Sequence, residues 1–471
     1  MFQRLSARLR PLDPEARDAG LSIVEVVVAL LVFAIITVGS IVAVGTTLTM
    51  SSDNRSREVA TNLAAQAVDV ARAMTDVIAV ASGTTTTVVN GTTFTVAQTA
   101  AWITTTGVDA TCTPAASSGN GSLFYKRLQV AVTWSGMRKA TAPVRSDTIL
   151  APNSRLNDQD TGTIVIGVKD TKGGPVPGVV VTVEPDTGSN APGKALTSGS
   201  KPGATNADGC AVAIKVLEGS YKVTVSRADA APYRDSRQQP APVKTGTVVV
   251  KGDTAGVSFT YDLGDDFELG YASNYTGGTV LLPNDLKTTV LGGPDPYVLN
   301  GPVSDAYLFP LTTGYQLIAG TYLPAGTSGG SCLSPDPAAW PANAAGKTAT
   351  RQPFVAASDK TAAYPLPMGV TTVKLASSGD TLVQARSTTA LNGDPGCAAS
   401  QTYTFTVKNK TSANEVTIAL PYGTWAISSG TSTSNLRSLT ISGLIGSIIG
   451  AVFGGSGGTA NVVTLDPRPA K

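Results

Sequence analysis

Glu25 is the residue whose position carries the most chemical information in this sequence. It stands five positions after Gly20 and directly before a run, Val26 to Ser52, that contains no Asp, Glu, Lys or Arg. A run of this length is enough to cross a bilayer. A carboxylate at the edge of such a run is costly unless it meets a cation. We therefore expect Glu25 to be a functional residue that pairs with a positive charge.

Two simpler interpretations explain less of this segment. A secretory signal peptide, with cleavage near Ala43-Val44-Gly45, has an apolar core of about 7–15 residues, and this run is longer. An ordinary single-span anchor fits the length, but it gives no reason for a glutamate just inside the apolar edge.

The sequence from Gly20 to Glu25, together with the apolar run that follows, closely resembles the N-terminal signature of type IV pilins and pseudopilins. The resemblance implies that a prepilin peptidase cuts between Gly20 and Leu21 and methylates the new amine of Leu21. It also implies that Glu25 neutralises that amine on a neighbouring subunit as the helices bundle into a filament, since a buried charge needs a partner. Leu21 departs from the phenylalanine that is commoner in the family.

The resemblance divides the N-terminal part into a prepilin leader, residues 1–20, and a transmembrane and filament-core helix, residues 21–52. The leader contains more arginines than acids, and basic flanks stay on the cytoplasmic side. We therefore expect a single-pass membrane protein before assembly and an extracellular filament at the cell surface afterwards. The implied partners are other pilins, inner-membrane pilus assembly proteins, the prepilin peptidase and the membrane.

Catalytic chemistry finds little support in the composition. The chain has no histidine, which removes Ser–His–Asp and Cys–His arrangements and most zinc sites. No paired-carboxylate motif is evident, so we expect no enzyme, no catalytic residue and no cofactor. The net charge of +2 gives no argument for nucleic acid or anionic lipid.

One acidic cluster surrounds Gly264 and, like Asp158 and Asp160 of the linker, is a candidate for a hard cation, which wants several oxygen ligands. It consists of Asp262, Asp265, Asp266 and Glu268. The cluster lacks the spacing of a known calcium loop, so a solvated turn between domains is the preferred interpretation, and we expect no metal site.

The four cysteines, Cys112, Cys210, Cys332 and Cys397, show no C-x-x-C spacing, which argues against metal knuckles and redox pairs. An exported chain is in an oxidising space, where cysteines pair. Three connectivities are open. We expect the disulfide Cys332–Cys397 because both residues lie in Gly/Pro/Ser-rich segments of the last third. Free buried thiols are the alternative, and the pairing of Cys112 and Cys210 is not determined by the sequence.

The elements that must carry these residues follow from periodicity. Apolar residues at three- and four-residue steps predict that the helix continues over 53–80. A short hairpin is predicted at Asn90-Gly91, a strong type I′ turn signal. Two further strands follow, at 125–134 and at about 141–150. A helix with a small antiparallel sheet resembles the pilin head, here residues 53–152.

Beyond the polar linker after Pro152 the composition turns to strands and turns. Residues 153–263 resemble a carboxypeptidase regulatory-like domain, a transthyretin-like β-sandwich that implies a spacer or binding module and no catalytic residues. A glycine, a hydroxyl residue and an aromatic recur at Gly219-Ser220-Tyr221, Gly320-Thr321-Tyr322 and Gly423-Thr424-Trp425. This repeat predicts two more β-rich modules, residues 264–365 and 366–471.

Two features of these modules have competing interpretations. Aromatic residues form either a binding surface or core, and core is preferred; they are Trp340, Trp425, Tyr297, Tyr307 and Tyr315. The glycine-punctuated apolar run 442–455 is either a buried hairpin or an exposed loop at a filament tip.

The fold class expected is therefore an α+β pilin N-terminal part followed by all-β sandwich modules. The expected function is a minor type IV pilin at the tip of a filament, or in its priming or adhesion, with an unidentified surface ligand such as host, sugar or DNA. The alternatives are a type II secretion pseudopilin and a membrane-anchored surface binding protein.

Overall fold

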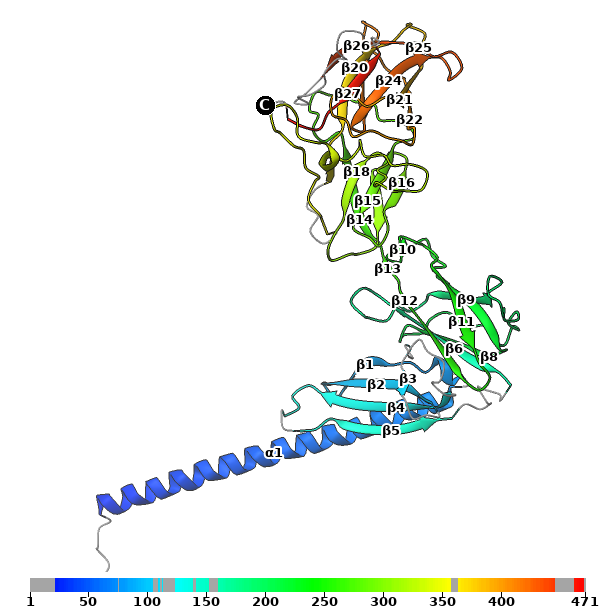
Figure 1. The fold of residues 1–471 in the computed structure, drawn as a ribbon. Coiled ribbons are helices and arrows are strands. Elements are labelled where there is room, and N and C mark those ends of the chain that lie inside the picture. The colour runs from blue at the N-terminus through cyan, green and yellow to red at the C-terminus, as the bar shows by residue number, and fades with distance from the viewer. Residues whose placement is uncertain are drawn as a thin grey trace, which may run out of the picture. The chain divides into compact units, whose positions relative to one another are not determined.

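The computed structural model describes residues 22–74, 76–104, 109–110, 112, 123–138, 141–151, 160–356, 363–444 and 461–469. The chain folds into two compact units (Figure 1). The first consists of residues 1–100 with 126–151, and the second of residues 101–125 with 152–471.

The predicted fold class is confirmed: a long N-terminal helix and an antiparallel sheet precede a series of β-sheets. The helix is α1 (Ile23–Ala73), followed by one 3-10 turn, η1 (Val77–Ala79). The sheet has the order β1-β2-β4-β5, with β3 paired to β2. Its strands are β1 (Gly83–Val89), β2 (Thr92–Thr104), β3 (Asp109–Ala110), β4 (Leu123–Trp134) and β5 (Val144–Leu150).

The second half of α1 packs on this sheet through small residues. Ala60, Ala64, Val68 and Ala71 are buried and recur at three- and four-residue steps on one face. They share a core with Phe94 and Val96 of β2 and with the inward residues of β4. Alanines at these positions let the helix backbone lie close to the sheet, so larger side chains would overpack the contact.

The predicted hairpin forms at Asn90 and Gly91. Both residues have positive φ, 50° and 79°, and Val89 pairs with Thr92 across the two-residue turn. Positive φ at both positions is what a type I′ turn requires.

The prediction that the helix continues to residue 80 is wrong, because α1 ends at Ala73. The Met74 amide bonds to the Ala71 carbonyl at 3.4 Å, a tightened last turn, and the Asp76 carboxylate accepts from the Ile78 amide at 2.8 Å and caps η1. The buried Lys126 ammonium then donates to the carbonyls of Val77, Ile78 and Val80. These non-helical partners satisfy backbone groups that a continuing helix would have used.

A β-sandwich follows within the second unit. Its two three-stranded sheets have the orders β12-β6-β8 and β11-β9-β7, and their inward residues form one core. The β6–β12 pair is parallel and the other pairs are antiparallel. The strands are β6 (Gly162–Lys169), β7 (Val180–Pro185), β8 (Cys210–Val216), β9 (Gly219–Ser226), β11 (Val243–Val249) and β12 (Thr254–Thr260). Two short strands, β10 (Tyr233–Arg234) and β13 (Asp262–Leu263), pair with each other in a separate sheet.

The rest of the second unit contains four sheets around one hydrophobic core that runs in sequence from Phe267 to Leu465. The first two have the orders β17-β14-β19 and β16-β15-β18, and the others β23-β20-β26 and β22-β21-β24-β25, with β27 on β24. The first group contains β14 (Asp265–Tyr271), β15 (Lys287–Leu291), β16 (Tyr297–Asn300), β17 (Asp305–Leu308), β18 (Gln316–Ala319) and β19 (Tyr364–Leu366), with the 3-10 turn η2 (Pro337–Ala339) before β19.

The second group contains β20 (Gly369–Lys374), β21 (Leu382–Ser387), β22 (Thr402–Thr406), β23 (Glu415–Leu420), β24 (Gly423–Gly430), β25 (Arg437–Ser438), β26 (Thr440–Leu444) and β27 (Val462–Leu465). β19 pairs with β14 and spans the boundary placed between residues 365 and 366, and side chains from both groups belong to the same core. Of the apolar run 442–455, residues 442–444 belong to β26, and residues 445–455 lie outside the described residues.

Candidate functional site

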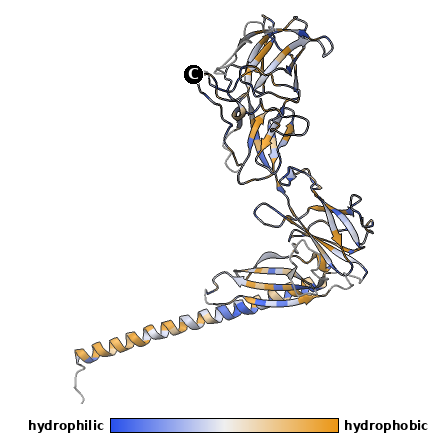
Figure 2. Cartoon of the chain, in the orientation of Figure 1, coloured by the Kyte–Doolittle hydropathy of each residue, from blue (hydrophilic) through white to orange (hydrophobic). Residues whose placement is uncertain are grey.

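The first half of α1 is bare. Every residue from Ser22 to Ser52 is exposed, and Figure 2 shows this part of α1 in the colour of apolar residues. The helix is long and apolar enough to cross a membrane by length and composition. At about 1.5 Å per residue, about 20 of its residues span the hydrocarbon core of a bilayer. So much exposed apolar surface marks a site that lipid or protein covers.

The hydroxyl groups between Thr37 and Thr49 are satisfied within the helix itself. Each of these five side chains donates to the carbonyl four residues earlier, at 2.7–3.1 Å; the donors are Thr37, Ser40, Thr46, Thr47 and Thr49. In an environment without water, an unsatisfied polar group costs several kcal/mol, so such back-bonding makes these residues compatible with lipid.

Glu25 lies in the first turn of α1 and is exposed. Its amide donates to the Ser22 carbonyl at 2.9 Å, so the helix begins at this point. A carboxylate in the first turn interacts favourably with the positive end of the helix dipole. Gly20 and Leu21 lie outside the described residues. Glu25 is therefore placed at the start of the bare segment, where a cation from another chain can approach it.

The cysteines are all paired in the structure. Cys332 is bonded to Cys397, with Cα atoms 3.8 Å apart, and Cys112 is bonded to Cys210, with Cα atoms 5.2 Å apart. The first bond joins the segment after β18 to the segment between β21 and β22. The second joins the segment after β3 to the first residue of β8.

The carboxylates of the acidic cluster around Gly264 do not come together into one metal-binding group. The Asp262 carboxylate accepts hydrogen bonds from the amide and hydroxyl of Thr171, at 3.0 and 2.7 Å. Asp265, Asp266 and Glu268 lie along β14, which pairs with β17. Among the described residues, no group of three His, Cys, Asp or Glu residues could hold a metal ion.

The aromatic candidates divide between core and surface. Trp340, Trp425 and Tyr315 are buried, Tyr297 is partly buried, and Tyr307 is 43% exposed. Burial raises the pKa of Tyr315 to about 12, in spite of the hydrogen bond it receives from Gln238. These side chains therefore do not gather into one exposed surface.

Three ion pairs with buried acids were not anticipated from the sequence. They are Arg351–Asp336, Arg437–Asp380 and Arg468–Asp466. The partners of the first two are 15 and 57 residues apart, so no local pattern signals them.

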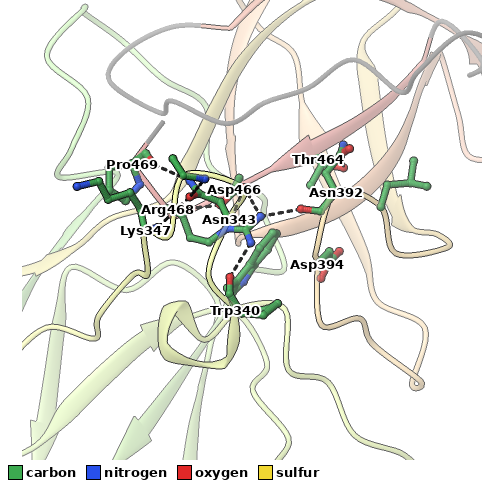
Figure 3. A network of polar contacts seen from close by, with 12 residues as sticks. Trp340, Asn343, Lys347, Asn392, Asp394, Thr464, Asp466, Arg468 and Pro469 are labelled. Atoms are coloured by element: carbon green, nitrogen blue, oxygen red, sulfur yellow. Dashed lines mark hydrogen bonds and ion pairs between the residues drawn. The ribbon is translucent and has the colours of Figure 1, made fainter. Parts of the chain in front are cut away.

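Arg468 is the most enclosed of the three arginines, and Figure 3 shows its surroundings. It donates to the Asp466 carboxylate, to the Pro341 carbonyl at 2.6 Å and to the Asn392 carbonyl at 2.6 Å, and it lies over the Trp340 ring at 5.1 Å. A buried charge with every partner in place is a structural feature of a well-ordered site. This network ties three chain segments together and offers no reactive group to a substrate.

No protein-family model matches the sequence, and a search of curated proteins finds no match. Among solved structures, the Bacillus anthracis TIE protein matches with 15% sequence identity and a TM-score of 0.19, covering 74% of this chain and 65% of that chain. The chain thus spans just under two thirds of the TIE protein. The Streptococcal ancillary pilin matches with 10% identity and a TM-score of 0.21, covering 51% of this chain and 74% of that chain. Similarity this low assigns neither a fold nor a function to the chain.

Proposed function

We propose that this protein is a minor type IV pilin, a membrane-inserted subunit that enters a surface filament. One observation carries the proposal: a single helix, α1, is bare and apolar over its first half and buries a row of small residues under an antiparallel sheet over its second half. A membrane anchor alone needs only the first half. A helix that continues rigidly from the bilayer into the head suits a subunit that is lifted out of the membrane and packed beside identical helices.

Maturation of the N-terminus supplies a positive charge that can pair with the Glu25 carboxylate. In this proposal a prepilin peptidase cuts between Gly20 and Leu21, frees the Leu21 amine and methylates it. The amine of one subunit then pairs with Glu25 of its neighbour in the filament. A buried charge that has a partner is tolerated, whereas an unpaired one is strongly destabilising.

The large second unit gives the subunit its place in the filament. A head with several β-modules is too bulky to repeat along the whole length of a filament, so the protein is rare and sits at the tip or in a priming complex. The β-sandwich of residues 162–260, with its carboxypeptidase regulatory-like strand pattern, acts as a spacer, and the distal modules face a surface ligand. Other pilins and inner-membrane assembly proteins are the proposed partners.

The test is the N-terminus of the mature chain. Co-expression with a prepilin peptidase should yield a protein that begins at a methylated Leu21, read by mass spectrometry. Gly20→Leu is the matched control and should stay uncleaved. A mature chain that begins near Thr46 would identify a signal peptide and refute the proposal.

A further inference from the structure

The Cys112–Cys210 disulfide closes a large covalent loop in the chain. The two cysteines are 98 residues apart in sequence. The loop contains β4 and β5 of the N-terminal sheet and β6 and β7 of the β-sandwich. A force that stretches the chain from its N-terminal helix to its last module meets two covalent routes between residues 112 and 210, and the short one is the disulfide.

Cys210 is firmly anchored in the sandwich. The Asn206 side-chain oxygen accepts from the amides of Asp208 and Cys210, both at 3.0 Å, and closes the turn before β8. Gly209 has a positive φ of 71°, and a Cβ atom there would lie 2.4 Å from the Val168 carbonyl oxygen. The Val168 amide donates to the Gly209 carbonyl at 2.8 Å. The turn is therefore fastened to the buried strand β6, and tension on Cys210 reaches the sandwich core directly.

We propose that the Cys112–Cys210 bond is a mechanical bypass, which carries tension from the N-terminal helix to the sandwich and keeps residues 113–209 out of the stretched path. The bypassed loop cannot extend while the bond is intact. At about 3.6 Å per extended residue, the bond withholds about 350 Å of chain. It also keeps β4 and β5 from being pulled away from the N-terminal sheet.

The bypass changes how the sandwich itself is pulled. Without the bond, tension enters β6 at Gly162 and leaves β12 at Thr260. These are opposite ends of a parallel pair, so the seven residue pairs from Thr163–Thr254 to Lys169–Thr260 resist together. With the bond, tension enters at Cys210, which pairs with Gly167, and leaves at Thr260, which pairs with Lys169. Both points lie at the same end of β6, so β8 and β12 peel from it pair by pair.

With the bond, the sandwich therefore unfolds at lower force than without it, and its unfolding releases a shorter length of chain. Peeling releases the chain between Cys210 and Thr260, about 180 Å when extended. The unbonded sandwich releases the chain from Gly162 to Thr260, about 350 Å. That tension arises at α1 in the cell rests on the proposed pilin function, whereas the force path itself follows from the covalent connections.

The experiment pulls single full-length molecules in detergent between handles attached enzymatically at the two chain ends. The wild type is compared with C112S/C210S, and C332S/C397S serves as the matched control. We expect C112S/C210S to gain about 350 Å of total extended length. We expect C332S/C397S to gain about 230 Å, from its loop of 65 residues, with the sandwich event unchanged. In C112S/C210S the sandwich event should become longer and occur at higher force.

A second measurement does not depend on the folding of the C112S/C210S variant. Individual C332S/C397S molecules are pulled before and after a phosphine reductant is added, which cleaves the remaining disulfide. The extended length should increase by about 350 Å. An unchanged length, or a sandwich that releases the same length at the same force with and without the bond, would overturn the proposal. Either result leaves the pilin proposal intact, because no filament is involved.

Discussion

The Arg72 guanidinium donates a 2.7 Å hydrogen bond to the Thr148 hydroxyl and so joins the last turn of α1 to the edge strand β5. Thr148 is buried, and the two residues are 76 positions apart in sequence. The bond fixes the helix on the sheet at the point where the chain leaves α1.

Replacement of Arg72 by alanine should lower the free energy of unfolding of the first unit by about 1.5–3 kcal/mol, the range for a hydrogen bond to a charged group. Chemical denaturation followed by circular dichroism measures the change. Arg57→Ala, at an exposed position of the same helix, is the control and should stay within about 0.5 kcal/mol of wild type. Equal effects of the two substitutions would contradict the role of the Arg72–Thr148 bond.

Replacement of Glu25 by alanine should leave membrane insertion intact and abolish entry into filaments, because the amine of the neighbouring subunit is left without a partner. Sheared filaments and membrane fractions, probed for the protein, measure the two steps separately. Glu58→Ala removes an exposed acid from the second half of the same helix and should enter filaments normally. Wild-type amounts of Glu25→Ala in sheared filaments would refute the pairing.

Replacement of Arg468 by methionine should destabilise the distal modules by about 3–5 kcal/mol, because Asp466 is left buried without its counter-charge. Thermal and urea denaturation measure the loss. Lys222→Ala breaks the exposed pair with Glu184 and should cost less than about 1 kcal/mol. The double variant with Asp466→Leu should recover part of the stability, since the stranded charge is gone; no recovery would point to packing instead.

A fragment of residues 160–471 with Cys210→Ser should fold alone as a soluble, β-rich protein. Its Cys332–Cys397 bond closes a loop of 65 residues and should contribute about 4 kcal/mol in the chain-entropy model. Reductant should lower the melting temperature of the distal modules more than that of the sandwich. Alkylation of both cysteines in the unreduced protein would contradict the bond, and an aggregated fragment would contradict independent folding.

Alkaline pH should destabilise the distal modules between pH 10 and 12. Burial raises the pKa of Tyr403 to about 12, while an unfolded tyrosine titrates near 10. Protonated Tyr403 therefore contributes stability in full below pH 10, and this contribution falls by about 1.4 kcal/mol per pH unit as the pH rises toward 12. Unfolding curves at stepped pH measure the slope. In Tyr403→Phe the slope should be smaller, and an unchanged slope would exclude Tyr403 as its source.

Local signals in the sequence predicted the local parts of the fold. The charge-free run and the alanine spacing predicted α1, and Asn90-Gly91 predicted a hairpin whose turn has the required positive φ values. The end of α1 at Ala73 was missed because it depends on Lys126, a residue from a distant strand. Asp336 and Arg351 lie 15 residues apart in the segment between β18 and β19, and the side chains of the distal core come from many strands. Residue spacing in the sequence does not predict such contacts.

The back-bonded hydroxyls of α1 have a consequence for the proposed passage of the subunit from the membrane into a filament. Since Thr37, Ser40 and the threonines near Gly45 already donate to their own helix, this surface makes the same hydrogen bonds among acyl chains as among neighbouring helices. Such a helix can slide and rotate against its neighbours without exchanging polar partners. In the proposed filament, the Glu25 carboxylate at the N-terminal end of this helix is then the group that fixes the stagger between subunits.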